Sequence, residues 1–353
     1  MLLQVTHETR YDYTPAVETA QHVAYLQPLT TPCQRLVSHA LEISPAPAQI
    51  RTSADVFGNA RSFFSLESPH TRLLVAARSV VETSATQPPA SAITWEQTRE
   101  RFRYRSGERF DAAAEFVFPS PFCPRHADFA AYARPSFAPG ASVLACARDL
   151  MRRIHTEFVY DGQSTEINTP ALEALAQRRG VCQDFAHIMI ACLRTMGLAA
   201  RYVSGYLLTL PAPGTVKLRG SDASHAWVSV YVPDLPDLPG GGRWCDLDPT
   251  NNRDGWHSPG EDYVTLAIGR DFADVSPIRG VIRGGASHTL EVGVTVEPMD
   301  SAANTASTAF AAQPSTPMVG SSGHSQSQNS SQGQSQNQTQ SQSQTQSQTQ
   351  LRS

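Results

Sequence analysis

The stretch RRGVCQDFAHIMIACLRTMGLAARYVSGY, Arg178–Tyr206, indicates how this chain folds and where its chemistry lies. Apolar residues recur at intervals of three and four after Cys182, which predicts a helix that ends near Gly197 and leads into a strand over 199–210. Free N–H groups and the positive end of the macrodipole favour the thiolate form of a cysteine at a helix N-terminus. Cys182 is therefore a candidate nucleophile, whereas Cys192, on the apolar face, is expected to be a packed thiol.

The composition, net charge and cysteine spacing of the sequence exclude several classes of protein. The chain has 353 residues, 40% of them hydrophobic, and a formal net charge of −4 without a long basic cluster, so we expect no nucleic-acid partner. No apolar run is long enough to span a membrane, and the N-terminus lacks the pattern of a signal peptide. The six cysteines form no C-x-x-C pair, which favours free thiols in a reducing cytoplasm. Asp184 and His187 lie three apart on one predicted helix without a third ligand, so we expect neither a metal nor a cofactor.

The pattern changes twice along the chain, which predicts three regions. Short alternating runs separated by turn formers predict an antiparallel β-sandwich over 1–85. Helical periods interleaved with strands predict an α+β core over 86–298, after a Pro/Ser/Ala-rich linker. The Ser/Gln-rich residues 299–353 have too few apolar side chains for a core, so we expect a disordered tail. The core's main predicted elements are helices over 141–158, 170–179 and the Cys182 segment, and strands over 199–210, 226–232, 244–247 and within 263–298.

Three motifs in the core fit one chemistry. They are GVCQDF at 180–185, SHAWV at 224–228 and WCDLDPTN at 244–251. A thiol that attacks an amide needs a base that later protonates the leaving amine, and the base needs an acceptor on its second ring nitrogen. His225, at the mouth of a strand, suits the first role. Asp248 suits the second, and Asp246 competes with it because residues two apart lie on one strand face.

The three motifs, in this order, resemble the transglutaminase-like superfamily, a papain-like group of cysteine enzymes. The HETRYDY run at 7–13 and the DVFGN run at 55–59 resemble the β domain that precedes this core in bacterial members. The resemblance implies a Cys-His-Asp triad in which Cys182 is the nucleophile, His225 the base and acid, and Asp248 the orienting carboxylate. It also implies a thioester formed with an amide of a protein or peptide and passed to an amine or to water.

Several points stay open at this level. The Cys182 N–H is the natural first oxyanion donor, and the second is sought in Tyr160, Gln163 or another side chain of the preceding loop. Asp184 is expected to cap the first helical turn rather than to react. The motifs do not distinguish cross-linking, deamidation and hydrolysis. A cysteine peptidase or amidase of the same fold is the nearest alternative, and a non-catalytic peptide-binding or scaffold module is the other.

Overall fold

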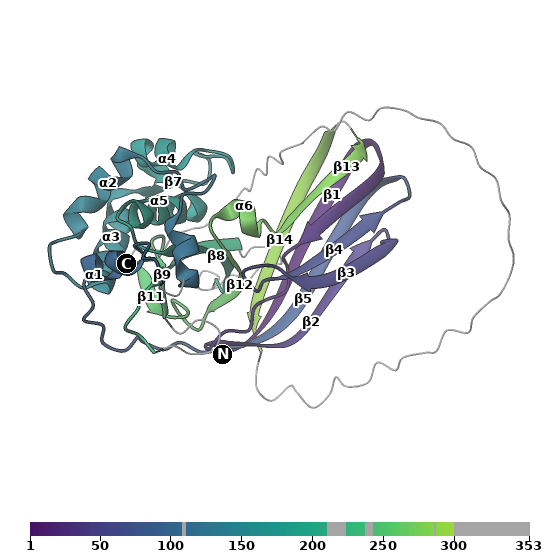
Figure 1. Ribbon diagram of the computed structural model, residues 1–353. Helices are drawn as coiled ribbons and strands as arrows, with labels where there is room; N and C mark the ends of the chain where they lie inside the picture. Colours follow the sequence, from purple (N-terminus) through teal and green to yellow (C-terminus); the bar gives the residue numbers. More distant parts are fainter. Residues whose placement is uncertain (108–110, 210–223, 237–242, 286, 300–353) are drawn as a thin grey trace, which may run out of the picture.

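The computed structural model describes residues 1–107, 111–209, 224–236, 243–285 and 287–299, which form two packed units (Figure 1). One unit is a large antiparallel sheet, and the other places helices against a second sheet (Figure 1). The predicted disordered tail, 299–353, lies outside the described residues except for Met299. In the part of the chain that is described, no helix is long and apolar enough to cross a membrane.

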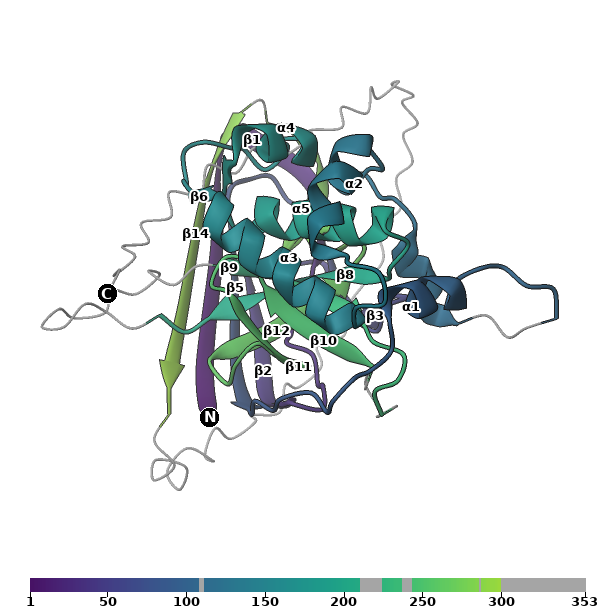
Figure 2. The ribbon, with the colours of Figure 1, turned by 90° about the vertical axis from the view of Figure 1, so that its left-hand side faces the viewer.

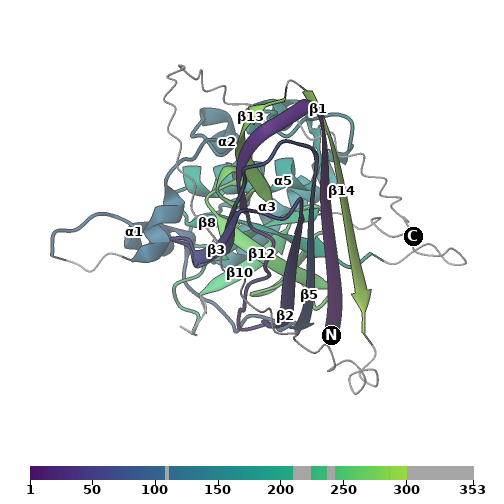
Figure 3. The same cartoon turned by 90° about the vertical axis from the view of Figure 1, so that its right-hand side faces the viewer.

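The first sheet is organised around β1, Leu2–Ala24, whose side chains alternate between buried and more exposed positions as expected for a strand with one face on a core. The first half of β1 pairs with β5 and, on its other side, with β14 (Figure 3). The second half of β1 pairs with β4. The sheet order is β2-β5-β1-β4-β3, and β13 and β14 also pair with β1. The other strands are β2 (Gln34–Ser44), β3 (Gln49–Ala54), β4 (Ala60–Leu66), β5 (His70–Thr83), β13 (Ile278–Gly284) and β14 (Ser287–Pro298).

This pairing confirms an antiparallel N-terminal β region and revises its extent. The described strands of this region are joined through β1 into one hydrogen-bonded sheet, and their arrangement as a sandwich stays a prediction. The strands within 278–298, which the sequence assigned to the catalytic core, belong to this sheet: Leu3 opposes Pro298, and Ala24 opposes Ile278. Alternating apolar residues identify a strand but not its partner, and these partners lie more than 250 residues away in the chain.

The second sheet has the order β11-β10-β9-β8-β12, and helices α3 and α5 cover one of its faces (Figure 2). The predicted helix over 141–158 is α3, Val143–Glu157, and the predicted Cys182 helix is α5, Cys182–Thr195. The strands are β8 (Ala200–Leu207), β9 (Ser224–Tyr231), β10 (Trp244–Asp248), β11 (Arg253–Trp256) and β12 (Tyr263–Gly269). The other described helices are α1 (Trp95–Arg101), α2 (Ala127–Ala133), α4 (Ala171–Gln177), α6 (Phe272–Val275) and the 3₁₀ turns η1 (Ala112–Val117) and η2 (Arg134–Ser136).

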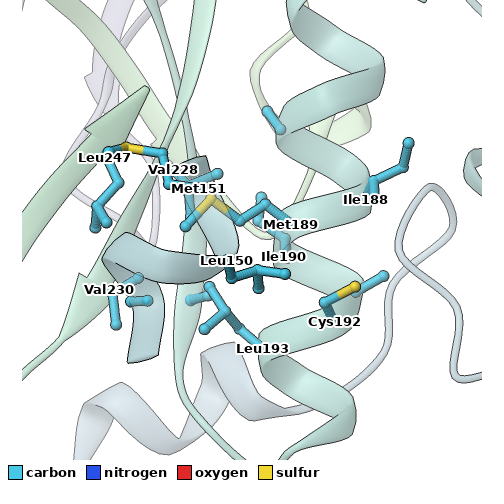
Figure 4. Packing of buried hydrophobic residues seen from close by; sticks show 14 of the residues in the cluster. Leu150, Met151, Ile188, Met189, Ile190, Cys192, Leu193, Val228, Val230 and Leu247 are labelled. Carbon is cyan, nitrogen blue, oxygen red and sulfur yellow. The ribbon is translucent and has the colours of Figure 1, made fainter. Parts of the chain in front are cut away.

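The core between α5 and the second sheet holds the start of α5 in place. Leu193 and Met189 of α5 lie in one buried cluster with Leu150 of α3 and with Val228 and Val230 of β9 (Figure 4). Each of these side chains has essentially no exposed surface. Fully burying one such side chain contributes roughly 1.5–3 kcal/mol, so this helix face is firmly anchored.

The turn between β3 and β4 joins the two units. Asp55 accepts hydrogen bonds from the backbone N–H groups of Phe57 (2.8 Å) and Asn59 (2.9 Å) and so closes the turn. The Asn59 amide then bonds both backbone groups of Ile268 on β12, at 2.7 and 2.8 Å. Asn59 is completely buried. The DVFGN run therefore serves as a clamp between the first sheet and the second.

Candidate functional site

A two-stranded parallel ribbon delivers Cys182 to the start of α5. Strand β6, Val159–Tyr160, pairs with β7, Arg179–Gly180, and the helix begins two residues later. A Cβ on Gly180 would lie 2.6 Å from a carboxylate oxygen of Asp184, so only glycine fits this close approach. The free N–H groups of the first turn of α5 lie at the same end of the helix as the Cys182 thiol.

Asp184 closes the first turn of α5, as expected from its position. Its Oδ2 accepts hydrogen bonds from the backbone N–H of Val181 (2.8 Å) and from the Thr165 hydroxyl (2.7 Å). Burial raises the pKa of Asp184, and these two hydrogen bonds oppose the rise. Because both bonds hold one carboxylate oxygen against the helix start, Asp184 orients the turn that carries Cys182.

The six cysteines are all buried and free. Cys182 is 6% exposed and Cys33 is 8% exposed, so accessibility alone does not distinguish these two thiols. Cys192 has no exposed surface and lies in the apolar core, as predicted (Figure 4). Burial raises the pKa of Cys192, which keeps it a neutral packing thiol.

His225 and Asp248 form a buried pair beside Cys182. His225 Nε2 lies 2.7 Å from Asp248 Oδ2, and neither side chain is more than 4% exposed. The Cys182 thiol is also close enough to His225 to influence its protonation through a hydrogen bond and through charge. Since Nε2 faces Asp248, Nδ1 is the ring nitrogen left for the thiol. The structure thus brings together all three residues named from the motifs.

In the His225–Asp248 pair, the charge of each side chain stabilises the charged form of the other. Burial acts to lower the pKa of His225, but the charge and hydrogen bond of Asp248, together with Cys182, outweigh it and raise this pKa well above 6.5. Burial acts to raise the pKa of Asp248, but His225 and the hydrogen bonds from Asn251 and Tyr263 lower it below 3.8. An imidazolium and a carboxylate are therefore the stable forms of the pair near neutral pH.

Asp248 accepts more hydrogen bonds than the motifs suggest. Its Oδ2 also receives the Asn251 amide and the Tyr263 hydroxyl, each at 2.7 Å, and its Oδ1 receives the Thr250 backbone N–H at 2.8 Å. Asn251 was visible as the last residue of the DPTN run. Tyr263 was not predicted, because it lies on β12 and no local pattern ties it to the site.

Asp246, the competing carboxylate, has a different partner. Its Oδ2 accepts a hydrogen bond from Trp227 Nε1 at 2.9 Å, and no contact with His225 is seen among the described residues. Trp227 is completely buried, and its ring centroid lies 6.1 Å from that of His225. Asp246 therefore supports the residue beside the imidazole, whereas Asp248 holds the imidazole itself. Trp244, at the start of the same strand, packs against Phe116 with ring centroids 5.4 Å apart.

Tyr160, one of the candidates for the second oxyanion donor, lies on β6 close enough to the site to be affected by its charges. The Tyr160 hydroxyl has its pKa raised by burial and by the negative charges of Cys182, Asp184 and Asp248, so it stays a neutral donor. The Gln163 side chain is exposed. Among the described residues no three His, Cys, Asp or Glu side chains cluster closely enough to hold a metal ion.

Comparisons with known proteins give the same two regions. Residues 3–82 match the model of the bacterial transglutaminase-like N-terminal region, and residues 130–249 match the model of the transglutaminase-like superfamily. The second match contains all three motif residues.

Two relatives and one solved structure extend this match over most of the chain. An uncharacterized protein of Mycobacterium tuberculosis strain H37Rv is 40% identical over 307 residues, which cover 84% of this chain and 93% of the relative. An uncharacterized protein of Mycobacterium leprae is 32% identical over 297 residues, which cover 83% and 98%. A crystal structure from Cytophaga hutchinsonii, described as a "Putative Cysteine Protease", superposes with a TM-score of 0.64 at 21% identity over 85% of this chain and 92% of that one. This likeness concerns the fold.

Proposed function

Because this chain belongs to the transglutaminase-like superfamily, whose members are cysteine-dependent acyltransferases or proteases, we propose that it carries out acyl transfer or hydrolysis on protein or peptide amides. Cys182 is the nucleophile, His225 the base and acid, and Asp248 the orienting carboxylate. The observation that carries the proposal is the buried His225–Asp248 pair, 2.7 Å apart, beside a thiol at the start of α5. Helix α5 packed on an antiparallel sheet also supports a papain-like core.

In the first step, Cys182 Sγ attacks the carbonyl carbon of the amide. The tetrahedral intermediate collapses, the C–N bond breaks, and the proton held on His225 passes to the leaving nitrogen. The product is a thioester of Cys182 and a free amine or ammonia. In the second step, water or a primary amine attacks the thioester carbonyl carbon, and its proton passes to His225. The C–S bond then breaks, which releases the carboxylic acid or the new amide and returns Cys182 as a thiolate beside the imidazolium.

Two donors are proposed for the oxyanion of the intermediate. The backbone N–H of Cys182 lies in the first turn of α5, where no helical carbonyl pairs with it. The Tyr160 hydroxyl is the second donor, because its raised pKa keeps its proton in place next to the negative charge of the site. Asp184 has no reactive role in this mechanism, since it is bound to the helix start.

The mechanism can be tested without knowing the substrate. Limiting iodoacetamide, followed by intact mass and peptide mapping, should modify Cys182 before the other five cysteines. Cys33 is the internal comparator, because its exposed fraction is similar and the described residues show it bonded to Thr86 and Trp256 instead of a histidine. Equal labelling of Cys33 and Cys182 would remove the argument for an activated thiol. Replacing His225 with glutamine should slow the labelling of Cys182 and leave that of Cys33 unchanged.

A second assay separates the reactions that share this mechanism. A glutamine-containing protein is incubated with a labelled primary amine, with Cys182→Ala as the matched control. Incorporation of the amine that is lost in the variant supports transfer to an amine. Ammonia release or chain cleavage without incorporation supports a hydrolase, which includes the peptidase or amidase alternative. Absence of turnover over a broad peptide library would favour a non-catalytic peptide-binding module.

The proposed cellular setting is the cytoplasm. Its support is the set of six cysteines, all of which are free in the structure. A reducing compartment also keeps the Cys182 thiol available. Fractionation of cells with an antibody against this chain tests the proposal, and recovery outside the cytoplasm would contradict it.

A further inference from the structure

A cavity of about 990 Å³ lies between the two units, away from the candidate catalytic residues. It is bordered by the β3–β4 turn, by η1 and by the first residues of β8 and β10. Arg201, on its wall, opposes Ser229 of β9, whereas His225 opposes Gly205. Arg201 and Gly205 lie four residues apart on β8, so about 13 Å of strand separates Arg201 from the position that His225 faces. None of the three motif residues lines this cavity.

Arg201 presents an unpaired cation to the cavity. Among the described residues, its side chain forms no hydrogen bond or ion pair, and its Nε is buried without a partner. Its guanidinium carbon lies 4.2 Å from the ring centroid of Trp244, which fixes the plane of the group. Burial lowers the pKa of Arg201 to about 10, partly offset by the charge of Asp246, so the side chain remains protonated at neutral pH. A buried guanidinium without acceptors is costly, so the cavity favours an anion.

The other charged groups of the wall are already engaged. Arg270 is held by Asp274 at 2.9 Å and lies 3.8 Å from Glu115, which accounts for both of these carboxylates. Asp55 is bound within its own turn. Two further wall arginines bond neutral groups: Arg61 donates to Ser53, and Arg279 donates to the Ala273 carbonyl and the Tyr25 hydroxyl. The wall therefore has no free carboxylate that would neutralise Arg201 in place of a ligand.

An aromatic wall continues from the Arg201 group. Phe116 meets Trp244 edge-on with ring centroids 5.4 Å apart, and Phe57 of the clamp turn lies 5.4 Å from Phe116. Aromatic walls favour a flat apolar body in edge-to-face or offset contact. Val56, at the tip of the turn, is 92% exposed beside this wall, which leaves an apolar lip at the cavity.

We propose that this cavity binds a small aromatic oxyanion, a carboxylate or a phosphate ester, with its oxygens on Arg201 and its ring against Phe116 and Phe57. A guanidinium is suited to either group, because its planar donors match two oxygens at once. The site is separate from the thiol, so its occupancy does not depend on the acyl-transfer chemistry.

The test is a titration of the full chain with benzoate and with phenyl phosphate, read by calorimetry and by the indole N–H resonance of Trp244. The chain has four tryptophans, so the indole resonance that is missing from the spectrum of Trp244→Phe is assigned to Trp244. Inorganic phosphate tests the oxyanion alone, and benzyl alcohol tests the ring alone. We expect one of the aromatic anions to bind with a Kd on the order of 1 mM or tighter. Which one binds identifies the oxyanion.

Arg201→Gln should weaken this binding roughly 10- to 100-fold, the usual value of a charge-assisted contact. Arg35→Gln is the matched control, because Arg35 pairs with Glu82 on the surface and does not line the cavity. Cys182→Ala should bind like the wild type. If Arg201→Gln fails to fold, Phe57→Ala should weaken phenyl phosphate binding and leave inorganic phosphate unchanged. No saturable change at Trp244 up to about 20 mM, or equal binding by a folded Arg201→Gln, would overturn the proposal.

Discussion

Replacing Asp248 with asparagine should damage this protein far more than the same replacement of Asp246, two residues away on β10. Both oxygens of Asp248 are acceptors: Oδ1 receives the backbone N–H of Thr250, and of Asn251 at 3.3 Å, and Oδ2 receives His225, Tyr263 and the Asn251 amide. An asparagine has one acceptor oxygen and one NH₂ group. Whichever way the amide is turned, at least two buried donors then face a donor.

The size of the effect follows from this count. Each buried donor without an acceptor costs about 1–3 kcal/mol, so Asp248→Asn should lower the free energy of unfolding by about 2–6 kcal/mol. Loss of the orienting carboxylate of a comparable triad reduces turnover by about 10⁴-fold, because the imidazole adopts the wrong tautomer. Asp246 binds Trp227 through Oδ2, and its Oδ1 has no hydrogen-bond partner among the described residues. An NH₂ group therefore fits at Oδ1. The change also removes the negative charge that partly offsets the burial of Arg201, and Asp246→Asn should still cost less than Asp248→Asn.

The two variants are compared by urea denaturation at pH 7, by the rate of Cys182 alkylation with iodoacetamide and by amine incorporation. We expect Asp248→Asn to be destabilised, slow in alkylation and nearly inactive, and Asp246→Asn to stay within about threefold of the wild type, as expected for a change of well under 1 kcal/mol in the barrier. The assignment of Asp248 as the orienting carboxylate is refuted if the two variants lose activity equally, or if Asp246→Asn is the inactive one.

Three further outcomes are expected. Tyr263→Phe should lower the free energy of unfolding by about 1.5–3 kcal/mol, because it removes a 2.7 Å donor to the buried Asp248 carboxylate; a change below about 0.5 kcal/mol in urea denaturation would contradict this contact. Asn59→Ala should cost about 2–4 kcal/mol, because it leaves both backbone groups of Ile268 unpaired, and hydrogen exchange of Ile268 should speed up; unchanged protection would rule out the clamp. The stability advantage of the wild type over Asp248→Asn should be greatest between the ordinary pKa values of the pair, 3.8 and 6.5. It should decline as the pH falls through the lowered pKa of Asp248 and as it rises through the raised pKa of His225, and a pH-independent difference would exclude the charge pair.

The local parts of the fold and site could be predicted because their causes are local. The period of the apolar residues and the Gly-Val turn place Cys182 at the start of a helix, and α5 begins there. The same period placed Cys192 in the core, where it has no exposed surface. The order of the three motifs then named His225 and Asp248, and the structure brings both to Cys182.

Sheet pairing had no such local cause. Alternation identified strands within 263–298, but their partner is β1 for residues 278–298, across nearly the whole chain. The hydrogen bond from Tyr263 to Asp248 follows from the return of β12 beside β8, and no spacing within the motifs contains it. Contacts between distant segments depend on which edges meet when the chain collapses, and the sequence pattern of each segment is compatible with several partners.

The sequence by itself therefore predicted the candidate nucleophile, its helix and the residue types of its partners, because 3.6-residue periodicity and turn residues act within a few positions of each other. The tertiary structure shows the physical difference between Asp248, which the motifs named, and Asp246. These carboxylates share a strand and a face, and the difference between them is which donors of β9 and β12 reach each one. It also placed Arg201 at a cavity whose wall offers it no free carboxylate, a property that depends on how the two sheets are placed against each other.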